Sequence, residues 1–513
     1  MTTSPSSRCP FAAGAGASTT GDGLSAANSS AAHADRPAAL TASFAAHPSG
    51  IWPPGPPTWL TGWSLLLQMS RDLPAALEAW RREYGDMVHL RIWPEHQIVV
   101  TDPQLVRELL VNHHDALVRW ERGIEVFAQL LGNGVLVEEG KAWQVKRRAL
   151  QPAFLPKSVN AFVPTIAAAT ASALERWRPG STPVPVESAV TALAMDVIMR
   201  MMFSSSIGDD ARMAERAVHQ LTAQANDEMY WPASWPEWTP WMRNKRRMIR
   251  ALRALIDGHV QARLAQPAQD WPDDLLSRLL ELHRDAPSDW PLDAVRDECM
   301  TAFVAGHETT AATLSWWMWC MAANPQVQQR AQQEVRDVLG GRPPERDDLP
   351  RLAWLGQTLQ ETLRLYPAAP VLMSRRTTAP IVLGGYSLPA RTIVMVPVGL
   401  LQRDARWFPE PEAFRPERFA PDAVTAPRGA FMPFGSGPHV CLGQHLALAE
   451  MTVIAAMILQ RFALSVPEGQ EAPKPVLNVT WRPDRPLNLR LQPLQLEPLP
   501  QSLPQLLPSR VSC

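Results

Sequence analysis

The alternation of hydrophobic and polar residues predicts a pair of strands near the start of the main body of the chain. Residues 87–93 alternate in polarity and 96–102 form a second apolar run, so the two segments are expected to pair. A helix is expected to end before them, near Tyr84. Asp102 followed by Pro103 indicates that another helix begins directly after the second strand.

Helical spacing then dominates from about 158 to 340, and strand character returns at 372–398 with turn residues at 384–386. The segments 476–481 and 487–491, separated by a Pro-containing stretch, predict a final hairpin. No internal linker separates two domains. The pattern therefore predicts one large domain of the mainly α class with small β-sheets (α+β).

The two ends of the chain differ in composition from this body. Residues 1–50 are rich in Ala, Ser, Thr and Gly, and we expect them to be disordered because such side chains bury too little surface to offset the entropy of ordering. Residues 491–513 are rich in Pro and Leu without a sustained period, which predicts an irregular tail. The folded domain is therefore expected to span 51–490.

Composition and charge exclude several classes of protein. The 513 residues include 49 Lys and Arg against 50 Asp and Glu, so no basic excess is available to neutralise a nucleic acid backbone. No apolar stretch is long enough for a transmembrane helix, and the start of the chain lacks the apolar core of a secretory signal. The five cysteines are widely spaced and form no C-x-x-C pair, which favours a reducing compartment. We expect a cytoplasmic protein.

The strongest candidate for chemistry is Cys441, which lies between a Gly- and Pro-rich loop and a long apolar helix. A thiol at the start of a helix lies at the positive end of the macrodipole, which lowers its pKa and favours the metal-binding thiolate. Gly435 and Gly443 leave room for a flat, bulky group. A buried structural cysteine is the alternative for a lone residue of this type, but Phe434, Gly437 and Gly443 form a rare combination with it.

This order, F-x-x-G-x-x-x-C-x-G, resembles the haem-binding signature of the cytochrome P450 family of haem-thiolate monooxygenases. The resemblance implies the fold of that family, with 51–490 as a single catalytic domain. It implies haem b (iron protoporphyrin IX) as cofactor and Cys441 as the axial ligand of its iron, where a thiolate favours O–O cleavage. Phe434, Gly435 and Gly443 would then lie against the haem.

The segment 305–310, Ala-Gly-His-Glu-Thr-Thr, resembles the family's oxygen-activation motif. Ala305 and Thr309 share one helix face, and Gly306 would thin the helix where a ligand approaches. The resemblance implies that Thr309 hydrogen-bonds dioxygen and that Glu308 helps to supply protons. The alternative from the residues themselves is a Thr309 bonded to its own i−4 carbonyl and a Glu308 held in a salt bridge.

Three further motifs extend the resemblance. Glu361 and Arg364 in E-x-x-R, with Arg418 about fifty residues later, match the family's structural Glu-Arg-Arg cluster. Haem propionates need cationic donors. The positions that match these donors in the family are Trp143, Arg147, His439 and Arg375, with Arg376 as the alternative to Arg375.

The resemblance implies a monooxygenase that hydroxylates, epoxidises or desaturates a hydrophobic small molecule such as a fatty acid, terpenoid or polyketide. No Gly-rich dinucleotide fingerprint follows a strand, so we expect electrons from NAD(P)H to arrive through a separate ferredoxin or flavodoxin and its reductase. Two alternatives remain open: a non-catalytic haem-binding or sensor protein, and a peroxide-driven haem-thiolate enzyme. The intact Glu308–Thr309 pair argues against both.

Two surface features remain. Lys146 and Arg148 flank the expected propionate ligand Arg147 and are candidate docking charges for a redox partner, with a solvated face as the alternative. Four tryptophans within 231–241 form a cluster that could contact a membrane or an apolar ligand, or pack under a loop.

Overall fold

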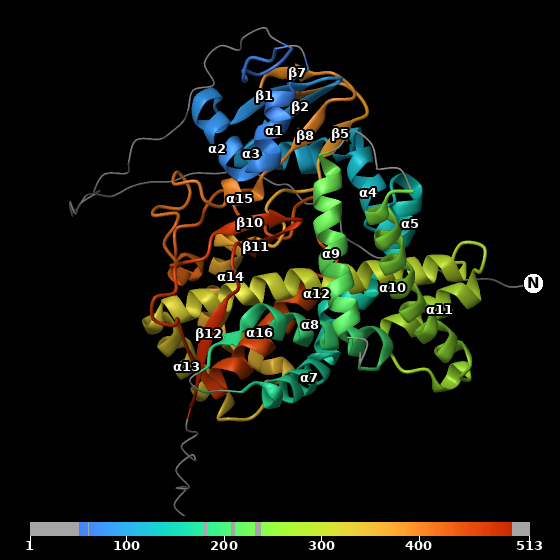
Figure 1. Cartoon of the computed structure of the whole chain (residues 1–513), viewed down its shortest axis with the longest axis vertical. Helices are drawn as coiled ribbons and strands as arrows, with labels where there is room; N and C mark the ends of the chain where they lie inside the picture. Colours follow the sequence, from blue (N-terminus) through green and yellow to red (C-terminus); the bar gives the residue numbers. More distant parts are fainter. Residues whose placement is uncertain are drawn as a thin grey trace, which may run out of the picture. The chain divides into compact units, whose positions relative to one another are not determined.

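The computed structural model describes residues 51–494, apart from 60, 179, 181, 207–210 and 231–237. Helices account for most of the ordered structure (Figure 1). Their bounds are α1 Trp63–Arg71, α2 Leu73–Tyr84, α3 Pro103–Arg107, α4 Glu121–Leu131, α5 Gly140–Leu150, α6 Pro156–Ala161, α7 Val163–Arg176, α8 Val186–Phe203, α9 Ala211–Met229, α10 Pro240–Leu264, α11 Leu275–Asp285, α12 Leu292–Ala323, α13 Pro325–Leu339, α14 Ala353–Leu365, α15 Val398–Leu401 and α16 Gln444–Arg461.

The strands form four small sheets among the described residues. Their bounds are β1 Met87–Ile92, β2 Glu95–Val100, β3 Leu117–Arg119, β4 Val184–Pro185, β5 Arg375–Thr377, β6 Ile381–Leu383, β7 Tyr386–Leu388, β8 Ile393–Met395, β9 Phe462–Ser465, β10 Pro475–Asn478, β11 Thr480–Pro483 and β12 Asn488–Pro493. The largest sheet has the order β1-β2-β8-β5-β3, and the others are β6-β7, β10-β11 and β4-β12-β9.

The first predicted elements are confirmed. β1 and β2 pair antiparallel with Met87 opposite Val100, and α2 ends at Tyr84. The carboxylate of Asp102 accepts hydrogen bonds from the amides of Gln104 and Leu105, both at 2.9 Å, which caps α3. The mostly helical, single-domain architecture agrees with the predicted mainly α (α+β) class.

The predicted final hairpin was wrong. The chain reverses within the first of its two segments, where Val479 takes a left-handed conformation (φ 61°) and Asn478 lies opposite Thr480. β12 pairs instead with β9 and β4. β12 also continues to Pro493, so the predicted tail from 491 begins inside a sheet. The predicted tail of residues 1–50, and the rest of the second tail beyond Leu494, lie outside the described residues.

α12 is a 32-residue helix, and its central and C-terminal turns are buried on nearly all sides. Its residues are apolar around most of the circumference, which is typical of a helix inside a protein core. Gly306 allows α8 to approach, because a Cβ there would lie 2.8 Å from Cδ1 of Ile198. The expectation that Gly306 leaves room for a ligand was therefore wrong.

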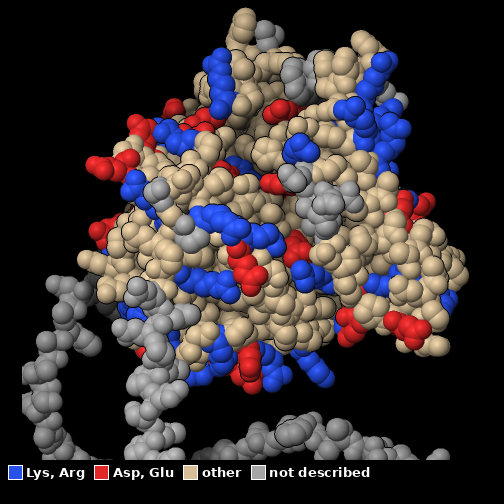
Figure 2. All heavy atoms as spheres, turned by 60° about the horizontal axis from the view of Figure 1, so that its bottom comes forward, with Lys and Arg blue, Asp and Glu red and all other residues tan. Residues whose placement is uncertain are grey.

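No helix within the described part of the chain is both long and apolar enough to cross a membrane. On the face shown in Figure 2, cationic and anionic side chains are interspersed, in keeping with a formal net charge of −1.

Candidate active site

The loop before α16 folds back on itself and presents Cys441. The amide of Cys441 donates to the carbonyl of Phe434 at 2.9 Å, and the amide of Gly435 donates to Met432, also at 2.9 Å. Gly437 has φ 75°, and a Cβ there would overlap the backbone carbonyl of Leu110. Glycine is therefore required at 437 for both conformational and steric reasons.

Cys441 is accessible, yet protein surrounds it closely enough for burial to raise the pKa of its thiol. The Gly443 amide and the Arg147 guanidinium act in the opposite direction, and their effect is smaller than that of burial. The prediction of a thiol pKa lowered by the helix start was therefore wrong, because desolvation is the largest contribution. A coordinated metal ion removes the proton from a thiol outright, so this raised pKa is compatible with a ligand role.

Trp143 and Arg147 on α5 lie directly beside the cysteine loop. The Trp143 ring stacks on His439 with 4.1 Å between ring centroids. Arg147 donates to the carbonyl of Val440 at 2.8 Å. These contacts bring three predicted propionate residues next to Cys441 from two distant parts of the sequence.

Arg375 on β5 belongs to the same group of cations. Burial, together with the charge of the nearby Arg119, lowers the pKa of Arg375 to about 10. Arg376, the alternative, lies on the other face of the strand and pairs with Glu95 at 2.9 Å and Glu121 at 2.6 Å. Of the two arginines, only Arg375 lines the small cavity that also contains His439.

No motif in the sequence pointed to Arg119, the residue at the end of β3. Arg119 is buried, pairs with Glu139 at 2.5 Å and donates to the carbonyl of Glu138 at 2.6 Å. Its charge acts on Arg147, Arg375 and His439. Nothing around it in the sequence resembles a motif, because its neighbours in the site come from other elements.

These cations provide the test of whether the residues fit a haem. Burial together with Arg119, Arg375 and Arg147 lowers the pKa of His439 to about 3, and these three guanidinium groups bring positive charge close to the cysteine loop. Among the residues that the structure describes, Glu139 is the only carboxylate that forms an ion pair with Arg119, Arg147, Arg375 or His439. A buried excess of cationic donors fits an anionic partner with two carboxylates, and a thiol nearby fits an iron ligand. The residues around Cys441 therefore fit a haem.

Gly443 supports the same conclusion. Its φ is −84°, and no described protein atom beyond its own chain neighbours lies within 4 Å of the position that a Cβ would take. The protein itself therefore does not require glycine at 443.

The central turns of α12 approach the cysteine loop. Ala305 is exposed although its neighbours Val304 and His307 are buried. Val304 belongs to the core cluster against which Leu442, the residue after Cys441, packs. The Thr309 hydroxyl donates to the carbonyl of Ala305 at 2.8 Å, which is the local bonding that the sequence left open as an alternative.

Glu308 points to a different face of the helix and is held by the strand β11. Its carboxylate accepts from Arg482 at 2.5 Å and from the Thr480 hydroxyl at 3.3 Å. Burial by itself would raise the pKa of Glu308, but Arg482 and His307 together hold that pKa below its ordinary value. The salt bridge, the second alternative from the sequence, is therefore present.

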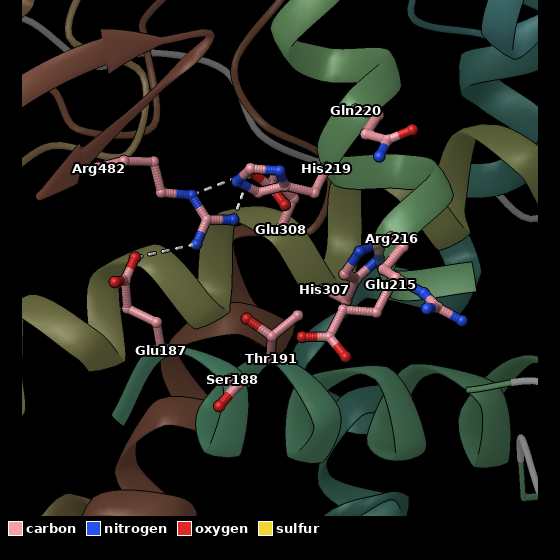
Figure 3. A pocket seen from close by; sticks show the side chains of 10 residues that line it. All are labelled: Glu187, Ser188, Thr191, Glu215, Arg216, His219, Gln220, His307, Glu308 and Arg482. Carbon is pink, nitrogen blue, oxygen red and sulfur yellow. Dashed lines mark hydrogen bonds and ion pairs between the residues drawn. The ribbon is translucent and has the colours of Figure 1, made fainter. Parts of the chain in front are cut away.

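Glu308 also lines a polar cavity of about 270 Å³ between α8, α9, α12 and β11 (Figure 3). Burial raises the pKa of both Glu187 and Glu215 in this cavity. The lining residues are Glu187, Ser188, Thr191, Glu215, Arg216, His219, Gln220, His307, Glu308 and Arg482. The cavity thus places several proton-binding groups beside the buried carboxylate of Glu308.

The predicted structural cluster is assembled. Arg364 forms two hydrogen bonds of 2.8 Å with Glu361, and both side chains are fully buried. Arg418 lies 3.3 Å from the same carboxylate, and the amide of Arg415 donates to it at 2.9 Å. Arg364 further donates to the carbonyl of Gln402, so the cluster ties α14 to the segments that lead to the cysteine loop.

Two other expectations have a structural outcome. Lys146 turns inward, where it donates to the carbonyl of Asn133 and lies 3.5 Å from the buried Glu298, so it is not a docking charge. Arg148 is exposed and remains a candidate. In the tryptophan cluster, Trp231 and Trp235 lie outside the described residues, whereas Trp238 and Trp241 are exposed.

Comparison with known proteins agrees with this geometry. Residues 53–489 match the family model described as Cytochrome P450. A Cyclooctat-9-en-7-ol 5-monooxygenase from Streptomyces melanosporofaciens is 35% identical over 78% of this chain and 86% of that protein. A cytokinin hydroxylase from Arabidopsis thaliana is 29% identical over 82% of this chain and 83% of its own. A putative cytochrome P450 132 from Mycobacterium bovis is 29% identical over 75% of this chain and 86% of that protein.

The chain therefore belongs to the cytochrome P450 family, and it is a haem-dependent monooxygenase. This confirms the resemblance drawn from Cys441 and its loop. The alternative of a non-catalytic haem protein is not supported, since the relatives include proteins named as a monooxygenase and a hydroxylase. The roles of individual site residues remain predictions.

Proposed function

We propose that this enzyme uses dioxygen and electrons from NAD(P)H to oxidise a hydrophobic small molecule, with a separate ferredoxin or flavodoxin and its reductase as electron donors. Hydroxylation is the expected reaction, and epoxidation and desaturation use the same groups. The observation that carries the proposal is the convergence of Cys441, Arg147 and Arg375 on one site next to the centre of α12. A cytoplasmic location would suit a protein that depends on NAD(P)H.

Haem, when bound, supplies the iron chemistry that activates dioxygen, and the chain supplies its position. Cys441 would ligate the iron through Sγ. Arg147, Arg375 and His439, with Trp143 stacked on the histidine, would hold the propionates. Arg119 would add a further buried cation to the same edge, and its ion pair with Glu139 keeps its side chain in place.

Glu308 and Thr309 would together deliver protons to the site. The Thr309 hydroxyl donates its hydrogen to Ala305, so its oxygen lone pairs remain free to accept a hydrogen bond on the open face of α12. Glu308, ionised beside Arg482, can take a proton from the polar cavity. Rotation of its side chain away from Arg482 would then carry that proton toward Thr309, the next residue on α12. This intact acid–hydroxyl pair favours dioxygen over peroxide as the oxidant.

The substrate class follows from the apolar residues nearest the site and from the relatives. Val304 on α12 is apolar and buried, and Val371 and Leu372 are half-buried on the approach to β5. One relative is named for acting on cyclooctat-9-en-7-ol and another for hydroxylating cytokinin, both small molecules. We propose a fatty acid, terpenoid or polyketide as the substrate of this chain.

The test begins with the ferrous–CO spectrum of the purified holoenzyme, followed by a substrate-induced spin-shift screen with lipids and natural products. Cys441→Ser should lose the thiolate-type band, and an unchanged spectrum would refute the ligand assignment. Thr309→Ala should retain haem but release peroxide instead of product. Thr313→Ala is the matched control, because Thr313 lies one turn further on and donates to the carbonyl of Thr309. Equal coupling of NAD(P)H to product in both variants would overturn the role of Thr309.

A further inference from the structure

A second buried carboxylate of α12, that of Glu298, lies outside the groups that the proposed function uses. The side chain of Glu298 is 1% exposed. The amide of Val135 donates to its Oε2 at 3.0 Å, whereas Oε1 has no hydrogen-bond partner among the described residues. Nζ of Lys146 lies 3.5 Å from Oε1. Because a buried charge needs close partners, this acid is only partly compensated.

The loop that Glu298 holds also holds Arg119. Val135 donates its amide to Glu298, and its carbonyl accepts from Arg119 at 3.4 Å. The carbonyls of Leu136 and Glu138 accept from the same guanidinium, the second of them at 2.6 Å. The loop between α4 and α5 therefore connects the buried acid of α12 to one of the cations near the cysteine loop.

The same carboxylate reaches a second of these cations through α5. Lys146 lies between two acids, 3.5 Å from Glu298 and 3.6 Å from Glu138. The next residue on α5 is Arg147, which donates to the carbonyl of Val440 in the cysteine loop at 2.8 Å. Adjacent residues of a helix share one hydrogen-bonded backbone. The acid that holds Lys146 therefore also affects the position of Arg147.

The charged groups in the neighbourhood of Glu298 come from α5, α10, α12 and the loop between α4 and α5. They are Lys146, Asp257, Arg296, Asp297 and Glu138. Asp297 pairs with Arg296 at 3.5 Å, and Arg296 also lies 3.9 Å from Asp257. These three charges thus pair with one another. Within the described part of the chain, Lys146 is the cation that pairs with Glu298.

This environment brings the titration of Glu298 to neutral pH. Burial, with a smaller contribution from Asp297, raises the pKa of the carboxyl to about 7, although the Val135 amide and Lys146 act in the opposite direction. A carboxyl in water is fully ionised at that pH. At neutral pH the side chain is therefore divided between a neutral and an ionised form, and only the ionised form attracts Lys146 by charge.

We propose that Glu298 is a positioning residue for Arg119 and Arg147, and that its gain or loss of a proton changes how firmly these arginines hold the haem edge. The ionised carboxylate draws Lys146 and the amide of Val135 toward α12, whereas the neutral carboxyl releases Lys146. The inference rests on the proposed propionate role of the two arginines and is independent of the substrate. Haem is therefore held more firmly above pH 7 than below it.

The test is the rate of haem transfer from the purified holoenzyme to apomyoglobin between pH 6 and pH 8. Transfer from the parent protein should be roughly fivefold faster at pH 6, because the pair of Glu298 with Lys146 is lost. Glu298→Gln, which resembles the neutral carboxyl, should transfer haem at the fast rate across this range. Lys146→Gln should do the same, because the carboxyl then has no cation. A rate that does not change with pH in the parent protein would overturn the proposal.

Urea unfolding separates positioning from a general loss of stability. The fold raises the pKa of Glu298, so its contribution to stability is fully present below the pKa of the unfolded chain and is lost as the pH rises through 7. Glu298→Gln should therefore be at least as stable as the parent protein at pH 8, although it loses haem faster there. A less stable variant at pH 8 would assign its faster transfer to destabilisation and overturn the positioning role.

The matched controls are Glu281→Gln on α11 and Lys141→Gln on α5, because both side chains are exposed. Both variants should keep the pH dependence of the parent protein. Infrared difference spectra of the parent protein against Glu298→Gln should show the carbonyl stretch of a protonated carboxyl, which disappears with a midpoint near pH 7. Absence of this band at pH 6 would overturn the proposal.

Arg147→Gln distinguishes failure of this inference from failure of the proposed function. This variant should transfer haem faster at every pH. An unchanged rate would refute the propionate role itself, whereas a pH dependence that survives in Glu298→Gln would refute only the positioning role.

Discussion

Arg482 on β11 holds the carboxylate of Glu308 on α12 at 2.5 Å, although 174 residues separate them in the sequence. Both side chains are at most 10% exposed. The guanidinium keeps a buried acid ionised beside the polar cavity, so the charge state of Glu308 depends on a residue outside the motif that identifies it.

Removing this guanidinium should destabilise the protein. Arg482→Met leaves Glu308 buried without its cation, and the free energy of unfolding should fall by about 3 kcal/mol. Urea unfolding of the holoenzyme measures this change. The double variant Glu308→Gln with Arg482→Met should recover part of the loss, since no charge is then left unpaired. Additive losses would show that the two residues do not interact.

The pH dependence of the same pair has a definite sign. The pKa of Glu308 is lower in the fold than in the unfolded chain, so its ionised form stabilises the protein above the ordinary carboxyl pKa. That stability should disappear as the pH falls through the lowered pKa of the folded state. Glu308→Gln should therefore reduce the difference in unfolding free energy between pH 6 and lower pH, and an unchanged profile would contradict the pairing.

Glu450 on α16 should show the opposite behaviour. It is buried against Thr310 of α12, and burial raises the pKa of its carboxyl to about 8. The unfolded chain releases this proton at much lower pH, so the contribution of Glu450 to stability falls as the pH rises toward 8. Glu450→Gln should match the parent protein at pH 5 and exceed its unfolding free energy at pH 8. Equal stability at both values would indicate that Glu450 is ionised in the fold.

Neutralising Glu361 should strongly destabilise the protein. Glu361→Gln leaves Arg364 without a counter-charge at a fully buried position, and we expect a loss of about 3–5 kcal/mol in unfolding free energy. Arg82→Gln is the control, because Arg82 pairs with Glu78 at 2.8 Å but is 77% exposed. It should cost less than about 0.5 kcal/mol. Similar losses in both variants would contradict the importance of burial.

Substitutions at Arg375 and at Arg376 should have different effects, the first on haem binding and the second on stability. Arg375→Gln removes a cation from the group around His439 and should speed haem transfer to apomyoglobin by about tenfold. Arg376→Gln breaks the pairs with Glu95 and Glu121, so it should lower unfolding free energy without changing the transfer rate. Faster transfer from Arg376→Gln alone would reverse the assignment.

Two glycines of the cysteine loop should also separate an effect on stability from an effect on haem binding. Gly437→Ala forces a left-handed alanine against the Leu110 carbonyl and should destabilise the haem-free protein by about 2 kcal/mol. Gly443→Ala meets no protein atom, so the haem-free protein should change by less than about 1 kcal/mol while its haem content falls. Normal haem content in Gly443→Ala would place the haem away from this residue.

Local patterns in the sequence predicted the elements whose contacts are themselves local. The pairing of β1 with β2 followed from alternation over a few residues, and the start of α3 followed from Asp102 and Pro103. The family followed from the spacing around Cys441. The prediction of the final hairpin was wrong because the chain turns at a single left-handed residue, Val479. This residue lies inside an apolar run whose pattern predicts one continuous strand.

The sequence alone therefore determined the family of the protein, and it predicted Cys441 as the iron ligand and Glu308 and Thr309 as the proton-handling residues. Only the tertiary structure decided that Arg119 joins the cations near Cys441 and that Arg482 holds Glu308. These partners come from separate strands, and no spacing rule connects them to the motifs. The physical reason is that a buried charge takes its partner from whichever segment packing brings within a few ångströms, and packing depends on the whole chain.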